Sequence, residues 1–330
     1  MNVPQKLISQ KIKISICRSA EDLLRIRPLW ESLRVDSAGT VFQSFDLNLL
    51  AAERFAEREQ PYVVCAESSA GAAIIPAVLR HGDNSIRLLG DELFDYRCFL
   101  HRGDDEVLRA ALAALALLER RLEILAMREN DRGTMAGELQ FLPFAAAPGV
   151  SGEQISAEQF AIAHTRLARN LRRLERLGFE LRSYDGRNAQ LLRSLYDGKA
   201  AQHPASLFHD AERIDFLVSA AALMPDVFEI FTVEKGPLMA AALVTLRDGE
   251  CRRFYTGWFA PEYEKHSPAL ALIYEVTRQS LAEGLECDYM TGEQPYKMRL
   301  ATSSVQLYRV CATPQALAAV AIRELLIAVG

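Results

Sequence analysis

The sequence predicts an α+β fold made of two tandem units, each with a mixed, mostly antiparallel sheet flanked by helices. The chain has 330 residues, half of them hydrophobic, which is enough to bury a large core and to divide into two domains. Apolar residues follow strand alternation in some stretches and helical spacing in others. The order of these elements in the first half returns in the second half, which indicates a duplicated unit.

The repeat lies in the order of elements rather than in residue identity. A strand, turn and strand around Gly71 correspond to the same arrangement around Gly236. The elements that follow keep nearly the same shift of half the chain: strand 85–89 with strand 251–255, the helix from Asp104 with the helix from Pro268, and strand 122–127 with strand 285–290. We therefore expect one unit at residues 1–150 and another at residues 151–330, connected through the Pro, Gly and Ser residues of 145–157.

In the first half, alternation and turn residues predict the strands, and helical spacing predicts the helices. Ser19 opens the sequence Ser-Ala-Glu-Asp, which is a capping signal for a helix. The expected strands lie at residues 11–17, 62–67, 72–79, 85–89 and 122–127, and the expected helices at 19–35, 45–58 and 104–121.

In the second half, the clearest helix start is at Ser267-Pro268. A Ser side chain can accept a hydrogen bond from an unpaired N–H of the first turn, and Pro has no backbone N–H that would be left unpaired there. Gly284 ends this helix. The last helix, from Thr313-Pro314 to Val329, is expected to form core or a contact between copies in an oligomer. The other expected helices lie at residues 157–177, 188–202 and 210–224, and the strands at 179–184, 227–233, 251–259, 285–290 and 303–310.

Composition narrows the function. The net charge of −5 argues against a nucleic-acid protein whose affinity comes from overall positive charge. Six cysteines have no C-x-x-C spacing, and His203, His209 and His266 lack the spacing of a metal site, so we expect buried thiols and no metal. The first residues lack the apolar core of a signal peptide, and no run is apolar enough to span a bilayer, so we expect a cytoplasmic protein without membrane insertion.

The densest collection of aromatic and ionisable residues lies at 251–299. A helix that begins soon after a strand offers free N–H groups and a positive dipole end, which suit a phosphate; the alternative is an ordinary capped helix. The corresponding loop of the first half has mainly Asp91, Glu92, Asp95, Tyr96 and Arg97. We therefore expect the chemistry in the second half or in a cleft between the halves.

One helix has a strongly basic face. In the 157–177 helix, Leu167, Leu171, Leu174 and Leu177 share one face. Five arginines share another: Arg166, Arg169, Arg172, Arg173 and Arg176. Such a face is solvated or meets a phosphate.

Several motifs resemble a known family. They are ARNLRRLERLG, the G-x-x-x-A-A-x-L-V strand from Gly236, FYTGWFAPEYEKHSP and CDYMTGEQPYK. Together they resemble the CelD/BcsL-type acetyltransferases, members of the GNAT superfamily with two GNAT-like halves that are related to the Fem-type aminoacyltransferases. The resemblance covers residues 157–309 well and the first half more loosely. Its most specific part is Asp288, Gly292, Tyr296 and Lys297.

The resemblance implies transfer of an acyl group, usually acetyl from acetyl-CoA, to an amine, often on an amino sugar or polysaccharide precursor. It places the acyl-CoA site in the second half and implies that the first half is degenerate. Carried over from the family, the pantetheine-binding strand is Thr256, Gly257 and Trp258, and the pyrophosphate loop comprises Lys265, His266, Ser267, Ala269 and Leu270. The family's loop is rich in glycine, whereas this one has none, and Ala269 stands where a glycine is expected.

Direct attack of an amine on a thioester needs a base, donors for the oxyanion and an acid for the thiolate. Glu293 is the candidate base, through water, and Tyr255 or Tyr296 the candidate acid. Lys297 could position an acidic substrate. The alternative interpretation is that Glu293 and Lys297 are exposed turn residues and Tyr255 is a core aromatic.

Two other functions fit the same sequence. A Fem-like transferase would use aminoacyl-tRNA, or a related enzyme an acyl carrier protein, and the arginine face from Arg166 to Arg176 would contact that donor. Alternatively, the fold has lost catalysis and serves as a binding or scaffold protein, which the glycine-free loop favours and the Tyr296-Lys297 pair opposes.

Overall fold

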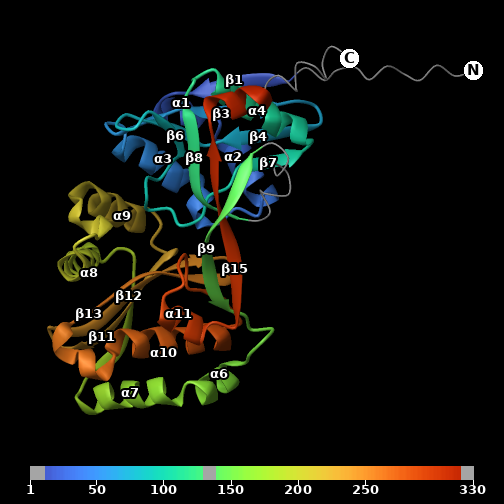
Figure 1. Cartoon of the computed structure of the whole chain (residues 1–330). Coiled ribbons are helices and arrows are strands. Elements are labelled where there is room, and N and C mark those ends of the chain that lie inside the picture. Colours follow the sequence, from blue (N-terminus) through green and yellow to red (C-terminus); the bar gives the residue numbers. More distant parts are fainter. Residues whose placement is uncertain (1–11, 129–138, 321–330) are drawn as a thin grey trace, which may run out of the picture. The chain divides into compact units, whose positions relative to one another are not determined.

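The computed structural model describes residues 12–128 and 139–320, and its contacts divide the chain into two compact units (Figure 1). Unit 1 comprises Met1–Phe144 and Leu307–Gly330, and unit 2 comprises Ala145–Gln306. The sequence suggests a single boundary at residue 150. In the structure the chain instead leaves unit 1 through one strand and returns to it through another, so unit 2 is inserted into unit 1.

Unit 1 contains two sheets. Its strands are β1 (Lys13–Cys17), β2 (Glu59–Pro61), β3 (Val63–Glu67), β4 (Gly71–Ile75), β5 (Ala77–Arg80), β6 (Ser85–Leu88), β7 (Leu100–Gly103) and β8 (Arg121–Met127). Its helices are α1 (Ala20–Arg25), α2 (Arg27–Asp36), the short 3₁₀ helix η1 (Val41–Gln43), α3 (Phe45–Arg54) and α4 (Asp105–Ala116). One sheet has the order β1-β3-β4-β7 and is antiparallel; the other joins β8, β6, β5 and β2, with β6 and β8 parallel.

Unit 2 is built on one sheet with the order β10-β11-β12-β13-β14-β9, in which only β13 and β14 are parallel. Its strands are β9 (Gln140–Val150), β10 (Glu180–Asp185), β11 (Phe228–Lys235), β12 (Leu238–Asp248), β13 (Cys251–Phe259) and β14 (Glu286–Asp288). Its helices are α6 (Ala157–Ala163), α7 (Thr165–Arg176), α8 (Ala189–Gln202), η2 (Leu207–His209), α9 (Ala211–Leu223), η3 (Pro261–His266), α10 (Pro268–Ala282) and α11 (Pro295–Leu300). Strands β9 and β15 (Ser303–Ala312) each begin in one unit and end in the other.

Helix α10 is the centre of unit 2. It packs on β11 to β14 on one side and against α6 and α7 on the other, whereas α8 and α9 lie on the opposite face of the sheet (Figure 1). The core between α10 and the sheet is apolar and includes Leu272, Val276 and Phe254, with the Phe254 ring edge-on to Tyr289 at 5.1 Å. These helices and sheets confirm the predicted α+β fold class.

The predicted helices at 19–35 and 157–177 are each broken in two. Pro28 lies in the first turn of α2, where its missing N–H costs nothing, and α1 ends at Ile26. The second break is at His164, which leaves helical geometry between α6 and α7. The interpretation of each stretch as one continuous helix was therefore wrong, since apolar spacing continues across a break of one residue.

Other local predictions also need correction. Residues 140–150, predicted as connection from position 145, form strand β9 despite their Pro and Gly content, because Gly149 allows close approach to β14: an added Cβ there would lie 2.7 Å from the Cys287 carbonyl oxygen. Residues 295–300, for which the sequence predicted no helix, form helix α11. Ser267 occupies the N-cap of α10 but makes no side-chain cap, because its backbone is left-handed, with φ 49°. The expected end of the last helix lies outside the described residues.

All six cysteines are free thiols, and Cys17, Cys65, Cys98 and Cys287 are buried. These four confirm the expectation of buried thiols.

Unit 1 contains a buried carboxyl that the fold does not satisfy. Glu59 on β2 is 1% exposed, and neither of its carboxylate oxygens has a hydrogen-bond partner. Asp91 lies nearby, where Arg58 and Arg80 approach its carboxylate at 3.7 and 3.8 Å. Burial, reinforced by Asp91 and opposed by Arg97, Arg80 and Arg58, raises the pKa of Glu59 to about 7.

We predict that Glu59 makes stability depend on pH. Because the folded pKa lies above the unfolded one, its contribution is complete below about pH 4.5 and is lost as pH rises through about 7, a change of about 3 kcal/mol. Urea unfolding between pH 5 and 8 should therefore show the Glu59→Gln variant gaining stability relative to the wild type as pH rises. Parallel pH profiles for the two proteins would contradict this.

Candidate functional site

Strand β13 has a backbone edge that is only partly paired. Its parallel partner β14 pairs with Cys251–Arg253 alone, whereas β12 follows β13 to Phe259. From Phe254 onward, no strand in the described part of the chain covers the edge that faces β14. A shift in the β12–β13 register leaves Tyr255 as the extra residue of a β-bulge. The half-buried residues Thr256, Gly257 and Trp258 follow it along the open edge.

Two consecutive arginines fix the point where β13 leaves β14. Arg252 is buried and donates to both carboxylate oxygens of Glu229, at 2.7 and 2.9 Å, and to the Ser280 hydroxyl on α10 at 2.7 Å. Arg253 donates to Asp248 at 2.8 Å and also pairs with Asp288 at the end of β14. Paired buried charges of this kind are costly to break, so this junction is expected to be rigid.

The motif residues that follow β14 shape the loop before α11. Asp288 accepts from the Met290 N–H at 2.8 Å, and Gly292 has φ 111°, a conformation open mainly to glycine. Lys297 is buried, and its ammonium donates to the carbonyls of Met290 at 3.2 Å and Thr291 at 2.8 Å. Lys297 therefore holds the backbone of this loop.

The N-terminal end of α10 has free hydrogen-bond donors. Ser267 makes no side-chain cap, Pro268 has no N–H, and the first amide bonded within the helix is that of Ala271, on the Ser267 carbonyl. The amides of Ala269 and Leu270 have no acceptor in the described residues. The first turn also lacks an acidic residue. Such an end attracts an anion.

A cavity of about 540 Å³ lies against this end of α10, and we call it the helix-end cavity. Ser267 and Leu270 of α10 line it, as do Tyr296 and Arg299 of α11 and Arg166 near the start of α7. This volume falls within the range of small-molecule sites. Three helix ends, distant in sequence, thus form one pocket.

The helix-end cavity is electropositive. Neither Arg166 nor Arg299 forms an ion pair with any described residue, and no acidic side chain lines the cavity. Burial, together with the charge of Arg299, lowers the pKa of His164. Burial raises the pKa of Tyr296, so its hydroxyl stays protonated at neutral pH. The cavity therefore offers positive charge and proton donors to an anionic ligand.

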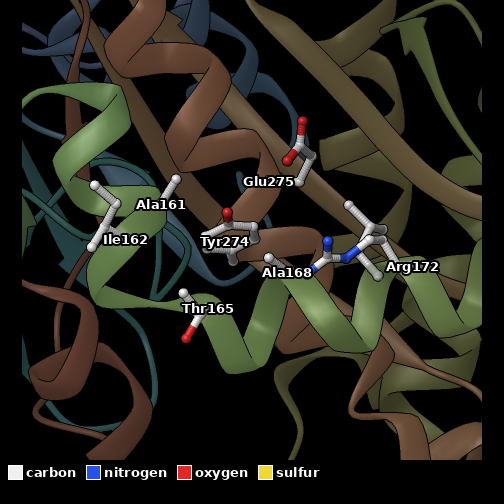
Figure 2. Close-up of a pocket in the computed structure, with 8 residues that line it drawn as sticks. Ala161, Ile162, Thr165, Ala168, Arg172, Tyr274 and Glu275 are labelled. Carbon is white, nitrogen blue, oxygen red and sulfur yellow. The ribbon is translucent and has the colours of Figure 1, made fainter.

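A second hollow, of about 390 Å³, lies between α6, α7 and α10 (Figure 2). Figure 2 shows the Tyr274 ring at its centre, with Ala161 on one side and Ala168 on the other. The carboxylate of Glu275 is already bonded to Arg278 at 2.6 and 3.0 Å. The walls of this hollow are more apolar than polar, although Thr165, Arg172 and Glu275 also line it.

The structure brings together only part of the predicted site. Ser267, Leu270 and Tyr296 line the helix-end cavity. Glu293 is exposed on a loop and Lys265 is exposed on η3, and neither lines the cavity. The remaining predicted residues are half-buried beside it or on β13: Tyr255, Thr256, Gly257, Trp258, His266 and Ala269.

The sequence did not single out four polar residues of the helix-end cavity: His164, Thr165, Asn170 and Arg299. Arg299 gave no signal because no helix was predicted for residues 295–300. Asn170, in contrast, did give a signal in the sequence. It is a polar residue on the face of α7 that carries Leu167, Leu171 and Leu174, and a buried polar group on an apolar face calls for a partner.

The described residues contain neither a metal-binding cluster nor a helix that could span a membrane. No group of three or more His, Cys, Asp or Glu side chains in 12–128 and 139–320 is placed to hold a metal ion. Over the same residues, no helix has both the length and the apolar character needed to cross a bilayer.

Comparison with known proteins identifies the fold. Residues 163–298 match the family model described as an acetyltransferase (GNAT) domain. This stretch runs from the end of α6 to α11 and contains most of the residues that line the helix-end cavity. Comparison with curated proteins gives no match.

Solved structures support this identification at low sequence identity. A tandem GNAT protein from the clavulanic acid biosynthesis pathway aligns over 92% of this chain and 99% of its own, with a TM-score of 0.55 and 10% identity. FemX aligns over 88% and 97%, with a TM-score of 0.59 and 9% identity. L-PGS from Bacillus licheniformis aligns over 90% and 96%, with a TM-score of 0.55 and 10% identity. The chain therefore has a GNAT-superfamily acetyltransferase fold.

We predict that Lys297 and Glu293 differ in their effect on stability. Lys297→Met leaves two loop carbonyls without their donor and should lower the free energy of unfolding by about 2 kcal/mol. Glu293→Gln changes an exposed side chain and should stay within about 0.5 kcal/mol of the wild type. Thermal unfolding of both variants tests this, and an unchanged melting temperature for Lys297→Met would refute the structural role of the ammonium.

Proposed function

We propose that unit 2 is an N-acyltransferase that moves an acyl group, acetyl in the simplest case, from acyl-CoA to an amine. The observation that carries the proposal is that the open edge of β13 leads through η3 to an uncapped helix end beside an electropositive cavity. An amide-containing pantetheine chain can hydrogen-bond to a free strand edge, and the N–H groups of Ala269 and Leu270 can hold phosphate.

The glycine-free loop is compatible with this proposal. In glycine-rich loops, glycine permits positive φ and close backbone approach. Here Ser267 itself adopts the left-handed conformation, with φ 49° and ψ 54°, and the two free amides follow it. Ala269 is half-buried and packs against the core of unit 2. The donors that a phosphate needs are thus present without glycine.

We assign the donor site to unit 2 because the corresponding helix of unit 1 is unsuited to an anion. Helix α4 is capped by the Asp104 side chain, which accepts from the Glu106 N–H at 3.0 Å, and its first turn contains Asp105 and Glu106. These three carboxylates fill and neutralise the helix end. This contrast supports the interpretation of unit 1 as degenerate.

In the proposed reaction the amine nitrogen attacks the thioester carbonyl carbon, forming the C–N bond, and collapse of the tetrahedral intermediate breaks the C–S bond. The amine loses a proton and the leaving thiolate gains one. Tyr296, which lines the cavity and stays protonated, is the proposed acid for the thiolate, with Tyr255 on the bulge as the other candidate. Glu293 is exposed and would accept the amine's proton through water.

Lys297 is a positioning residue in this scheme. Its ammonium holds the loop that carries Glu293 and the start of the helix that carries Tyr296. For the acceptor we propose an amine on a sugar or polysaccharide precursor, on the strength of the family resemblance alone.

A Fem-like, aminoacyl-tRNA-dependent reaction is the second candidate. All five arginines of the α7 face are exposed, and FemX shares the fold. We predict that, if tRNA is the donor, its binding weakens steeply between 50 and about 200 mM salt, as phosphate contacts require. Electrophoretic mobility shifts with aminoacylated tRNA test this, and no retardation at low salt would rule it out.

We predict that acetyl-CoA raises the melting temperature, by an amount equivalent to about 2.7 kcal/mol at a hundred times its dissociation constant. Gly257→Ala should fold, since its Cβ would lie 3.5 Å from the Ala242 oxygen, but should weaken binding about tenfold by placing a methyl group beside the open edge. Gly152→Ala is the matched control, because its Cβ would meet nothing within 4 Å.

Differential scanning fluorimetry with acetyl-CoA, a longer acyl-CoA and free CoA measures these shifts. Thiol release in the presence of candidate amines then measures transfer. If no CoA species shifts the wild type at millimolar concentration, the proposal fails, and carrier-protein or tRNA donors or a non-catalytic role take its place.

A further inference from the structure

We infer that the α7 side of the helix-end cavity is a second phosphate site, which takes the ribose phosphate of CoA and so selects CoA over donors that lack that group. This inference rests on the function proposed above, in which the α10 side takes the pyrophosphate. It concerns Arg166 and Asn170, which the resemblance does not assign to the donor site.

Helix α7 starts at the wall of the cavity. The break at His164 separates it from α6, and His164 provides no side-chain cap. The His164 carbonyl accepts from the amides of Leu167 and Ala168, so the amides of Thr165 and Arg166 precede the first bonds of the helix. Ala163 to Leu167 all line the cavity. A second helix N-terminus therefore faces the same space as that of α10.

Asn170 indicates that a ligand belongs here. It lines the cavity, is 7% exposed, and its side-chain amide makes no hydrogen bond to any residue in the described ranges. Its amide atoms are not sealed within the protein but open to the cavity, so a ligand there can form the hydrogen bonds that the protein does not supply. Asn170 lies one turn after Arg166 on α7, so both can approach the same group.

The charges in the cavity favour a ligand with more than one phosphate. Arg166 comes from α7 and Arg299 from α11, and neither is neutralised by a carboxylate in the described structure. Two uncapped helix ends add partial positive charge at two separate points. A single phosphate can occupy only one of these points.

Among the candidate donors, this arrangement fits CoA. CoA has a pyrophosphate in its chain and a separate phosphate on its ribose, whereas carrier-bound phosphopantetheine has a single phosphodiester. The volume of about 540 Å³ leaves room for a nucleotide between the two helix ends. Selection between the two donors would then depend on Arg166 and Asn170.

The test compares the binding of CoA and dephospho-CoA by isothermal titration calorimetry at fixed ionic strength. The wild type should bind CoA at least about tenfold more tightly than dephospho-CoA, as expected for a charge-assisted hydrogen bond. Arg166→Gln should lose most of this preference and bind dephospho-CoA as the wild type does. Arg176→Gln, the same change in the last turn of α7 and outside the cavity, should keep it.

Each other outcome counts against the inference. Equal binding of CoA and dephospho-CoA by the wild type overturns it and leaves the proposed function standing. If Arg166→Gln and Arg176→Gln lose the preference for CoA equally, that preference comes from the overall charge of the helix and not from a local site, and the inference is wrong. If neither nucleotide binds, both the inference and the proposed function fail.

Discussion

The candidate site in unit 2 depends on the short length of the ladder between β13 and β14. Their parallel ladder covers three residues on each strand, and the Arg253–Asp288 ion pair and the Arg252 network hold it at that point. A parallel pair needs a crossover, and α10 supplies it. Because β13 extends beyond the ladder while α10 returns along the sheet, a free strand edge and a free helix end lie in the same unit, a short distance apart in sequence. Both present backbone groups without a hydrogen-bond partner, and a ligand can bond to such groups.

Unit 1 has the same parallel strand pair with a helix in the crossover, but the start of its helix is not free. β6 and β8 are parallel neighbours, and α4 precedes β8 as α10 precedes β14. The start of α4, however, is satisfied by the Asp104 cap and by two further acidic residues. The same topology thus leaves a free helix start in unit 2 and a capped one in unit 1, and the residues at the helix start decide which.

Some ionisable residues of unit 2 are bonded within the protein and others are open to the helix-end cavity, and residue type alone does not reveal which. The sequence singled out Lys297 as a group that could position an acidic substrate, yet its ammonium is hydrogen-bonded to two backbone carbonyls. Arg299, two positions later, has no ion-pair partner in the described structure and faces the cavity. Burial explains the difference. A buried ammonium must be bonded to its surroundings, whereas a cation at a cavity wall remains available to a ligand.

The sequence by itself determined the fold class and most strands and helices, because alternation, helical spacing and capping residues act locally. It also identified Ser267, Leu270 and Tyr296, which line the cavity. It could not reveal the breaks at Ile26 and His164, strand β9, or the insertion of unit 2 within unit 1. Only the tertiary structure decided that Arg166 and Asn170 of α7 share one cavity with Arg299 of α11, since the two helices lie far apart in the chain and only the packing of the folded unit brings them together.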